Sequence, residues 1–337
     1  MLAISSLLAT GWISQPVRQR PHRTAAPLRW DEILCGMTQV VTDIDDTIKS
    51  SGGVNIGGIA LGGVDISYER NSFYPGVFQF GLELASHTAK PRDPPNKMAV
   101  LTARAEEFKW ALEIKQSSKL CTRYRQAGEA AGLEGWGVGE VLYGSVLEWV
   151  CQERKGWRKF ENFKILRKGL KPRTKYVFLG DNGKSEKDFE AATRIVDAFP
   201  KELQAVFLHA VSGETQPAPL PEDSEYRGVP VMHYRTYATA AVKAFDRRLL
   251  DADAARRVVE AVEADMALDP INLAPGSANA VLLQEEIEEA YEALDGAGLG
   301  RRLKNSWRGV WRKPPSLESP VPKKGRDDSA KSKSGSA

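Results

Sequence analysis

The chain has few of the features by which several protein classes are recognised. It contains three cysteines and no C-x-x-C pair, which excludes a disulfide framework and a zinc ribbon. It has no G-x-S-x-G, H-E-x-x-H or G-x-G-x-x-G sequence, and so lacks the signatures of α/β-hydrolases, zinc proteases and dinucleotide-binding folds. The four histidines show no metal-ligand spacing, and we expect them to have structural roles.

Long apolar runs and a large net charge are absent as well. No stretch reaches the roughly 18 apolar residues of a membrane-spanning helix, so we expect a protein that is not transmembrane. Lys and Arg number 47 and Asp and Glu 44, a formal net charge of +3. This balance predicts no nucleic-acid partner, and any basic site must be local. The length of 337 residues predicts about two domains.

The N-terminal segment, residues 1–36, reads as a leader. Residues 1–30 contain four arginines and no acidic residue, which resembles a mitochondrial or plastid transit peptide. The alternative is a disordered leader or a misassigned start codon. We therefore expect an intracellular protein, in a plastid or mitochondrion if the leader is a targeting signal and otherwise in the cytoplasm.

Residues 37–250 alternate short apolar runs with amphipathic stretches such as Ala105–Ala131 and Lys159–Leu170. This alternation predicts an α/β domain with a parallel sheet. The expected strands are Thr38–Thr42, Lys97–Leu101, Glu140–Tyr143, Lys175–Leu179, Gln204–Leu208 and Val229–His233.

The remainder of the chain differs in composition. Residues 251–312 are predicted to form a helical extension, with helices over Ala254–Met266 and Ala278–Leu294. Residues 313–337 are rich in Pro, Ser, Lys and Gly, which predicts a disordered basic tail.

A short repeat, GGVNI-GGIAL-GGVDI, occupies Gly52–Ile66. Paired glycines followed by β-branched residues favour a tightly turning hairpin or flap. A flexible linker is the alternative.

Three carboxylates follow the first predicted strand within four residues: Asp43, Asp45 and Asp46. Like charges at a strand end are costly unless a cation neutralises them. In open α/β sheets, ligands bind outside the carboxyl ends of the strands. Mg²⁺, which takes a few carboxylates together with water and phosphate oxygens, is the expected cofactor.

The sequence Asp43-x-Asp45-x-Thr47 resembles motif I of the haloacid dehalogenase-like phosphatases. The longer run DIDDTIK is similar to the catalytic domain of the Mg²⁺-dependent phosphatidate phosphatases of the actin-patch type. The resemblance implies a Rossmann-like parallel sheet over residues 37–250, with a small flap instead of a large cap. The loop after Thr102 differs from that of the named enzymes, which indicates a divergent branch.

Two further motifs of that family bind the phosphate. Thr102, after the apolar run Met98–Leu101, matches the motif II hydroxyl. Lys159, at the start of a predicted helix, matches the motif III lysine, and Lys164 is the alternative.

The fourth motif of the family is a pair of acids that hold the metal. Asp181 follows the apolar strand Tyr176–Leu179 and matches the first acid. The second acid is Asp188 if the loop carries a short insertion, and Glu186 otherwise. The resemblance thus implies Asp43, Asp45, Asp181 and Asp188 as the metal site.

The mechanism implied by the resemblance is a two-step phosphoryl transfer. Asp43 attacks phosphorus and forms an aspartyl-phosphate. Asp45 protonates the leaving oxygen and later takes a proton from water. Asp46 is expected to face away and cap the next turn, and Thr47 to position Asp45.

Two basic segments suggest an anionic membrane surface and, as substrate, phosphatidate. Residues 151–175 hold ten Lys or Arg against two Glu, and Arg301–Lys313 interleaves six basic residues with apolar ones, a pattern typical of interfacial helices. Alternatives are a soluble sugar or nucleotide phosphatase, or a binding module that has lost turnover. The oligomeric state is not predicted.

Overall fold

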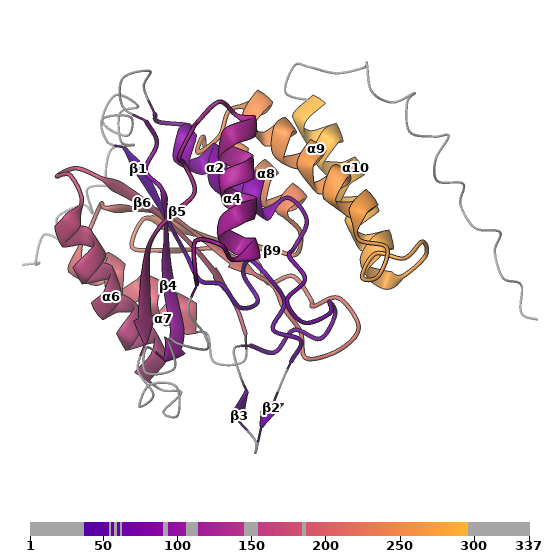
Figure 1. The fold of residues 1–337 in the computed structure, drawn as a ribbon, viewed down its shortest axis with the longest axis horizontal. Helices are drawn as coiled ribbons and strands as arrows, with labels where there is room; N and C mark the ends of the chain where they lie inside the picture. The colour runs from indigo at the N-terminus through magenta and orange to yellow at the C-terminus, as the bar shows by residue number, and fades with distance from the viewer. Residues whose placement is uncertain are drawn as a thin grey trace, which may run out of the picture.

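The computed structural model describes residues 37–53, 55–56, 59–60, 63–89, 94–105, 114–144, 154–183 and 187–295. These residues form an α/β fold built on a seven-stranded, mostly parallel sheet with helices on both faces (Figure 1). The predicted Rossmann-like architecture is confirmed.

The strand order is β5-β4-β1-β6-β7-β9-β8, and only β8 runs antiparallel to its neighbour. The central strand β1 pairs in parallel with both β4 and β6. The bounds are β1 Thr38–Thr42, β4 Met98–Ala105, β5 Val138–Gly144, β6 Lys175–Asp181, β7 Leu203–His209, β8 Ser224–Tyr226 and β9 Val229–Tyr234.

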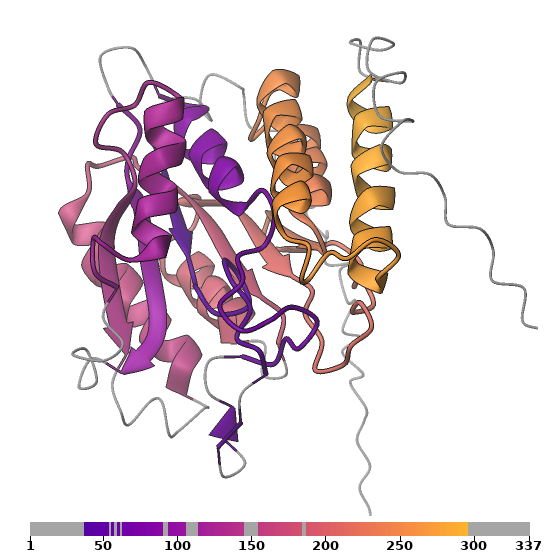
Figure 2. The ribbon, with the colours of Figure 1, turned by 45° about the vertical axis from the view of Figure 1, so that its right-hand side comes forward.

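Two hydrophobic clusters, one on each face, hold the helices to the sheet. On one face lie α6 (Lys155–Gly169) and α7 (Lys187–Ala198). The other face carries α2 (Val77–Ser86), α4 (Lys119–Ala130) and α8 (Tyr237–Asp246). Helix α9 (Ala252–Leu268) packs on α2 and α8, and α10 (Ala278–Leu294) packs on α8 and α9 (Figure 2). Buried strand residues alternate between the two clusters, as in β1, where Val40 faces one and Val41 the other. This explains why the strands read as continuous apolar runs.

Helix starts are marked by ordinary capping residues. The side chains of Ser118, Thr236, Asp251 and Ser277 each accept a hydrogen bond from a backbone N–H in the first turn of α4, α8, α9 and α10. Each cap satisfies one of the unpaired donors at a helix start. The helical C-terminal segment expected from the sequence is therefore present in α9 and α10, within one or two residues at each end.

Some predicted boundaries are wrong. Strand β4 continues past Leu101 to Ala105, because after a register shift Ala105 still pairs with Gly144 of β5. The amphipathic stretch Ala105–Ala131 is therefore not one helix: it begins in β4, and α4 starts at Lys119. Helix α6 starts at Lys155, so Lys159 lies one turn inside it and not at its start. The short edge strand β8 was not predicted.

The glycine repeat contains a hairpin. Strands β2 (Asn55–Ile56) and β3 (Ile59–Ala60) pair antiparallel, and both ribbon views show them projecting beyond the end of the molecule at which β4 ends. A hairpin agrees with the flap interpretation. The predicted leader, the basic segment Arg301–Lys313 and the predicted tail lie outside the described residues.

Within the part of the chain that the structure describes, none of the helices combines the length and the apolar character that crossing a bilayer requires.

Candidate functional site

Three of the predicted site residues come from neighbouring parallel strands at the centre of the sheet. Asp43 follows β1 and Asp181 is the last residue of β6, whereas Thr102 lies within β4, three residues before its end. Thr42, which precedes Asp43, pairs with Leu179 of β6 and with Val100 of β4. This register brings the three side chains to one edge of the sheet.

A cluster of three carboxylates forms at this edge. Oxygen atoms of Asp43, Asp181 and Asp188 all lie within 4.8 Å of one another. Asp188 comes from the first turn of α7, and its carboxylate accepts the backbone N–H of Asp181 at 3.1 Å. Gly180 permits this approach, since a Cβ there would overlap the Asp188 side chain. We call these three residues the aspartate cluster.

Lys159 reaches the aspartate cluster from α6. Its ammonium group lies 2.9 Å from Asp43 Oδ2 and also pairs with Asp188, and its side chain is 5% exposed. Lys164 does not reach the cluster: its side chain is 38% exposed and pairs with Glu161 on the same helix at 2.7 Å. Of the two candidate lysines, the structure brings Lys159 to the carboxylates. Glu186, the alternative to Asp188, lies outside the described residues.

Burial dominates the electrostatics of the cluster. It raises the pKa of Asp43 to about 7, with Lys159 opposing the rise and the neighbouring Asp188 and Asp45 adding to it. Burial and the charge of Asp188 raise the pKa of Asp181 well above its ordinary range. Burial lowers the pKa of Lys159, but Asp188 and Asp43 more than offset this, so the net pKa is raised. The cluster holds more negative charge than one lysine balances.

Asp45 and Thr102 lie beside the cluster. Asp45 is half-buried, and its charge contributes to the raised pKa of Asp43. Thr102 is 1% exposed, and the register of β4 places it beside the start of the loop after β1. Neither residue belongs to the aspartate cluster, so of the four predicted metal ligands three come together and Asp45 does not.

Asp46 caps backbone groups, and its charge also adds to the raised pKa of Asp181. Its carboxylate accepts the N–H groups of Ser51 at 2.8 Å, Val64 at 2.5 Å and Asp65 at 3.0 Å. These donors lie at both ends of the segment that carries the β2–β3 hairpin. Asp46 therefore fastens the base of the flap to the loop that carries Asp45.

Sequence reasoning missed Lys155. This half-buried residue lies one turn before Lys159 on α6. Burial and the charge of Lys159 lower its pKa, while the charges of Asp43, Asp181 and Asp45 act in the opposite direction. Lys155 is thus close enough to the carboxylates to interact with them. The i,i+4 spacing to Lys159 on one helix face was the available signal.

The aspartate cluster could hold a metal ion. Its donors are carboxylate oxygens, the ligand type of hard cations such as Mg²⁺ and Ca²⁺. Burial raises the pKa of Asp43 and Asp181 and so disfavours their charged forms, which a nearby positive charge would favour. A divalent cation would supply it, so the residues present fit such an ion.

A scan against protein-family models, a search of curated proteins and a search of solved structures each found no significant match to this chain. The fold and the site therefore define the protein as an α/β protein with a buried aspartate–lysine cluster at the carboxyl edge of its parallel sheet.

Proposed function

We propose that this chain is a Mg²⁺-dependent phosphomonoester phosphatase with Asp43 as its nucleophile. The contact between the buried Lys159 ammonium and Asp43, beside two more carboxylates, carries the proposal. Phosphoryl transfer needs little covalent machinery and much charge neutralisation. A carboxylate nucleophile, a fixed cation and a metal-binding acid pair are the parts that this chemistry uses.

In the first step, Asp43 Oδ attacks phosphorus, the bond to the leaving oxygen breaks, and Asp45 gives its proton to that oxygen. In the second step, Asp45 takes a proton from water, the water oxygen attacks phosphorus, and phosphate leaves Asp43. Lys159 and the Thr102 hydroxyl bind the phosphoryl oxygens. Asp43, Asp181 and Asp188 would hold Mg²⁺, which supplies positive charge opposite these oxygens.

Hydrolysis of p-nitrophenyl phosphate by the purified full-length chain tests the class of reaction. We expect turnover in Mg²⁺ and none in EDTA. Asp43→Asn removes the nucleophile and should abolish turnover, whereas the matched exposed variant Asp246→Asn should keep it. Equal rates for Asp43→Asn and the wild type would exclude the covalent mechanism.

For the substrate, we propose phosphatidate at a membrane surface. The exposed Arg154 lies directly before α6, and the first turn of the helix carries Trp157, which is 42% exposed. The Arg158 guanidinium lies over the Trp157 ring, 5.7 Å from its centroid. A tryptophan among basic residues is typical of contact with anionic headgroups. Further along α6 the basic excess is reduced by the pairs Lys164–Glu161 and Arg167–Glu202.

The variant Trp157→Ala tests whether the substrate is a lipid in a membrane or a soluble phosphomonoester. The matched control is Ile165→Ala, because Ile165 is 55% exposed on the same helix but about 12 Å further along its axis. Trp157→Ala should weaken binding to phosphatidate vesicles and lower the rate of phosphatidate hydrolysis, and both losses should be larger than those caused by Ile165→Ala. Hydrolysis of p-nitrophenyl phosphate should stay unchanged. Activity on vesicles should also fall as salt rises.

A panel of sugar phosphates, nucleotides and phosphatidate vesicles tests the alternatives. Efficient hydrolysis of sugar phosphates or nucleotides without vesicle binding would retain the phosphatase and reject the lipid. Binding to vesicles or proteins without hydrolysis of any phosphomonoester would instead indicate a binding module.

A further inference from the structure

A buried histidine outside the aspartate cluster connects two distant parts of the chain. His209, the last residue of β7, is 4% exposed. Its Nδ1 lies 2.7 Å from the carbonyl oxygen of Asp46, and its Nε2 lies 3.0 Å from that of Arg235. Both partners are acceptors, so each contact needs an N–H on the ring. The neutral ring carries one and the imidazolium two, so at least one carbonyl is hydrogen-bonded in either form.

Aromatic neighbours hold the imidazole ring in place. Tyr74 meets it edge to face at 4.4 Å between centroids, and Tyr234 stacks on it at 5.2 Å with an interplanar angle of 28°. Because Tyr74 and Tyr234 both pack against the imidazole ring, it has little freedom to rotate away from the two carbonyls.

The Asp46 carbonyl belongs to the loop that carries Asp45. Asp46 has φ +63°, a left-handed conformation that a residue with a side chain adopts only at a cost. The next carbonyl, that of Thr47, accepts the Tyr237 hydroxyl at 2.7 Å. His209 and Tyr237, both distant from Asp45 in the sequence, thus form hydrogen bonds with the carbonyls of Asp46 and Thr47, the two residues directly after Asp45.

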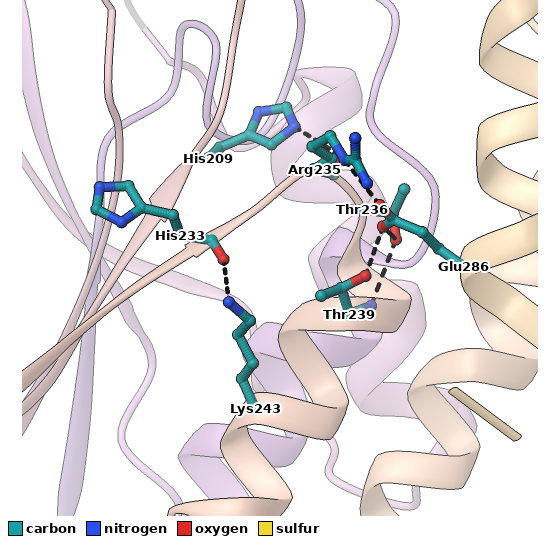
Figure 3. A network of polar contacts seen from close by, with 7 residues as sticks. All are labelled: His209, His233, Arg235, Thr236, Thr239, Lys243 and Glu286. Atoms are coloured by element: carbon teal, nitrogen blue, oxygen red, sulfur yellow. Dashed lines mark hydrogen bonds and ion pairs between the residues drawn. The ribbon is translucent and has the colours of Figure 1, made fainter. Parts of the chain in front are cut away.

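Arg235, whose carbonyl meets His209 Nε2, also contacts α10 through its side chain. Glu286 of this helix is 4% exposed, and its carboxylate accepts the Arg235 Nε–H at 2.9 Å, the Thr236 hydroxyl at 2.7 Å and the Thr239 hydroxyl at 2.5 Å. Figure 3 shows Glu286 reaching from α10 toward these groups, while His209 approaches the same segment from the other side. The segment after β9 is therefore held between His209 and α10.

We propose that His209 is a positioning residue: it holds the backbone of the Asp45–Thr47 loop so that the Asp45 carboxyl faces the phosphoryl site, with Glu286 as the anchor on α10. This rests on the proposed phosphatase function. A misplaced proton donor loses most of its effect, and displacement by about 1 Å can cost on the order of 100-fold in rate. His209 acts through Asp46 and does not touch the substrate.

The dependence on the leaving group distinguishes positioning of Asp45 from general damage. An alkyl phosphate expels a strongly basic oxygen and depends on proton donation, whereas p-nitrophenolate leaves with little help. His209→Phe keeps an aromatic ring and removes both nitrogens. We expect it to lower kcat for an alkyl phosphate at least tenfold more than kcat for p-nitrophenyl phosphate. KM and the Mg²⁺ concentration for half-maximal rate should stay within about twofold, because the aspartate cluster is untouched.

Three variants accompany this measurement. His209→Gln retains one donor nitrogen, its side-chain amide, and should give an intermediate ratio of the two rates. It replaces His209→Phe if the latter does not fold. Glu286→Gln should change the ratio in the same direction by a smaller factor. His233→Phe is the matched control, because the His233 ring points away from Arg235 (Figure 3) and its Nδ1 meets the Glu222 carbonyl instead; it should leave the ratio unchanged.

Hydrogen exchange tests the same proposal without activity. In His209→Phe, amides in residues 43–51 should exchange faster than in the wild type, and those of α4 should not. An equal loss for both substrates, or no loss, overturns the positioning role. If the wild type hydrolyses no phosphomonoester, the proposed function fails. The hydrogen-exchange result then decides separately whether His209 holds the Asp45–Thr47 loop: faster exchange of residues 43–51 in His209→Phe supports this role, and unchanged exchange overturns it.

Discussion

Lys159 Nζ lies 2.9 Å from Asp43 Oδ2, although Asp43 follows the central strand of the sheet and Lys159 belongs to a helix more than a hundred residues later. Both side chains are almost completely buried. A buried ion pair of this kind is weak evidence for a role in stability, since its desolvation cost offsets its attraction. Its position beside Asp181 and Asp188 supports the proposed function, in which the lysine and a metal ion face an anionic substrate.

Replacing Lys159 by Gln should affect both stability and activity. Removing one partner of a buried ion pair leaves uncompensated charge and costs about 3–5 kcal/mol in the free energy of unfolding. The loss of a charge that stabilises the transition state should lower kcat by on the order of 100-fold. Urea denaturation and p-nitrophenyl phosphate kinetics measure the two effects.

Lys164→Gln is the control for this variant. Lys164 is exposed and pairs only within α6 among the contacts described above, so its replacement should change stability by no more than about 0.5 kcal/mol. Comparable activity losses in both variants would contradict the assignment of Lys159.

Metal affinity should depend on both Asp181, at the end of β6, and Asp188, at the start of α7. Asp181→Asn and Asp188→Asn should each raise the Mg²⁺ concentration for half-maximal rate by at least about tenfold, and calorimetric titration should show weaker binding. Glu190→Gln is a suitable control, because Glu190 lies in the same first turn of α7 but pairs with Lys187 and Arg194. If Glu186→Gln weakens Mg²⁺ binding and Asp188→Asn does not, Glu186 is the second acid.

The metal-free protein should lose stability as pH rises. The pKa of Asp43 is raised from 3.8 to about 7 in the folded protein, mainly by burial, so the folded state binds its proton more tightly than the unfolded state does. The resulting stabilisation is complete below about pH 4 and is lost as pH rises through 7. Asp181 changes in the same direction.

Thermal unfolding in EDTA between pH 5 and pH 8 checks this sign. The melting temperature of the wild type should fall across this range by several degrees more than that of Asp43→Asn, which has no proton to lose. Mg²⁺ at pH 8 should restore it by binding the folded state. An identical pH dependence in the two proteins would show that Asp43 titrates normally.

Gly63 should tolerate no side chain. A Cβ at this position would overlap the Asp46 carboxylate, which cannot move away because it accepts three backbone N–H groups. Gly63→Ala should therefore cost about 1–3 kcal/mol and loosen the base of the flap. Gly213→Ala is the control, because the nearest atom to its Cβ would be the Val64 oxygen at an ordinary 3.7 Å. Equal unfolding free energies for the two variants, measured in urea, would contradict a fixed position of the Asp46 carboxylate beside Gly63.

Much of the fold follows from local pattern. Apolar runs of strand length separated by amphipathic stretches placed six of the sheet strands, β1 at its observed bounds. The acids of the site were visible because Asp43 and Asp181 directly follow or end apolar strands, and parallel strands bring their carboxyl ends to one edge. Lys159 was recognisable through the resemblance to a phosphatase motif, but its choice over Lys164 depended on which face of α6 is buried.

What the sequence determined by itself is therefore what has a period or a local order: strands, helices, the glycine hairpin and the strand-end carboxylates. The tertiary structure decided the pairings between distant residues. His209 meets Asp46, and Glu286 meets Arg235, only because β7, β9 and α10 pack in one particular order on the sheet. No local pattern encodes such contacts, because they result from the packing of whole elements, and a single side chain carries no signal of the partner that packing will bring to it.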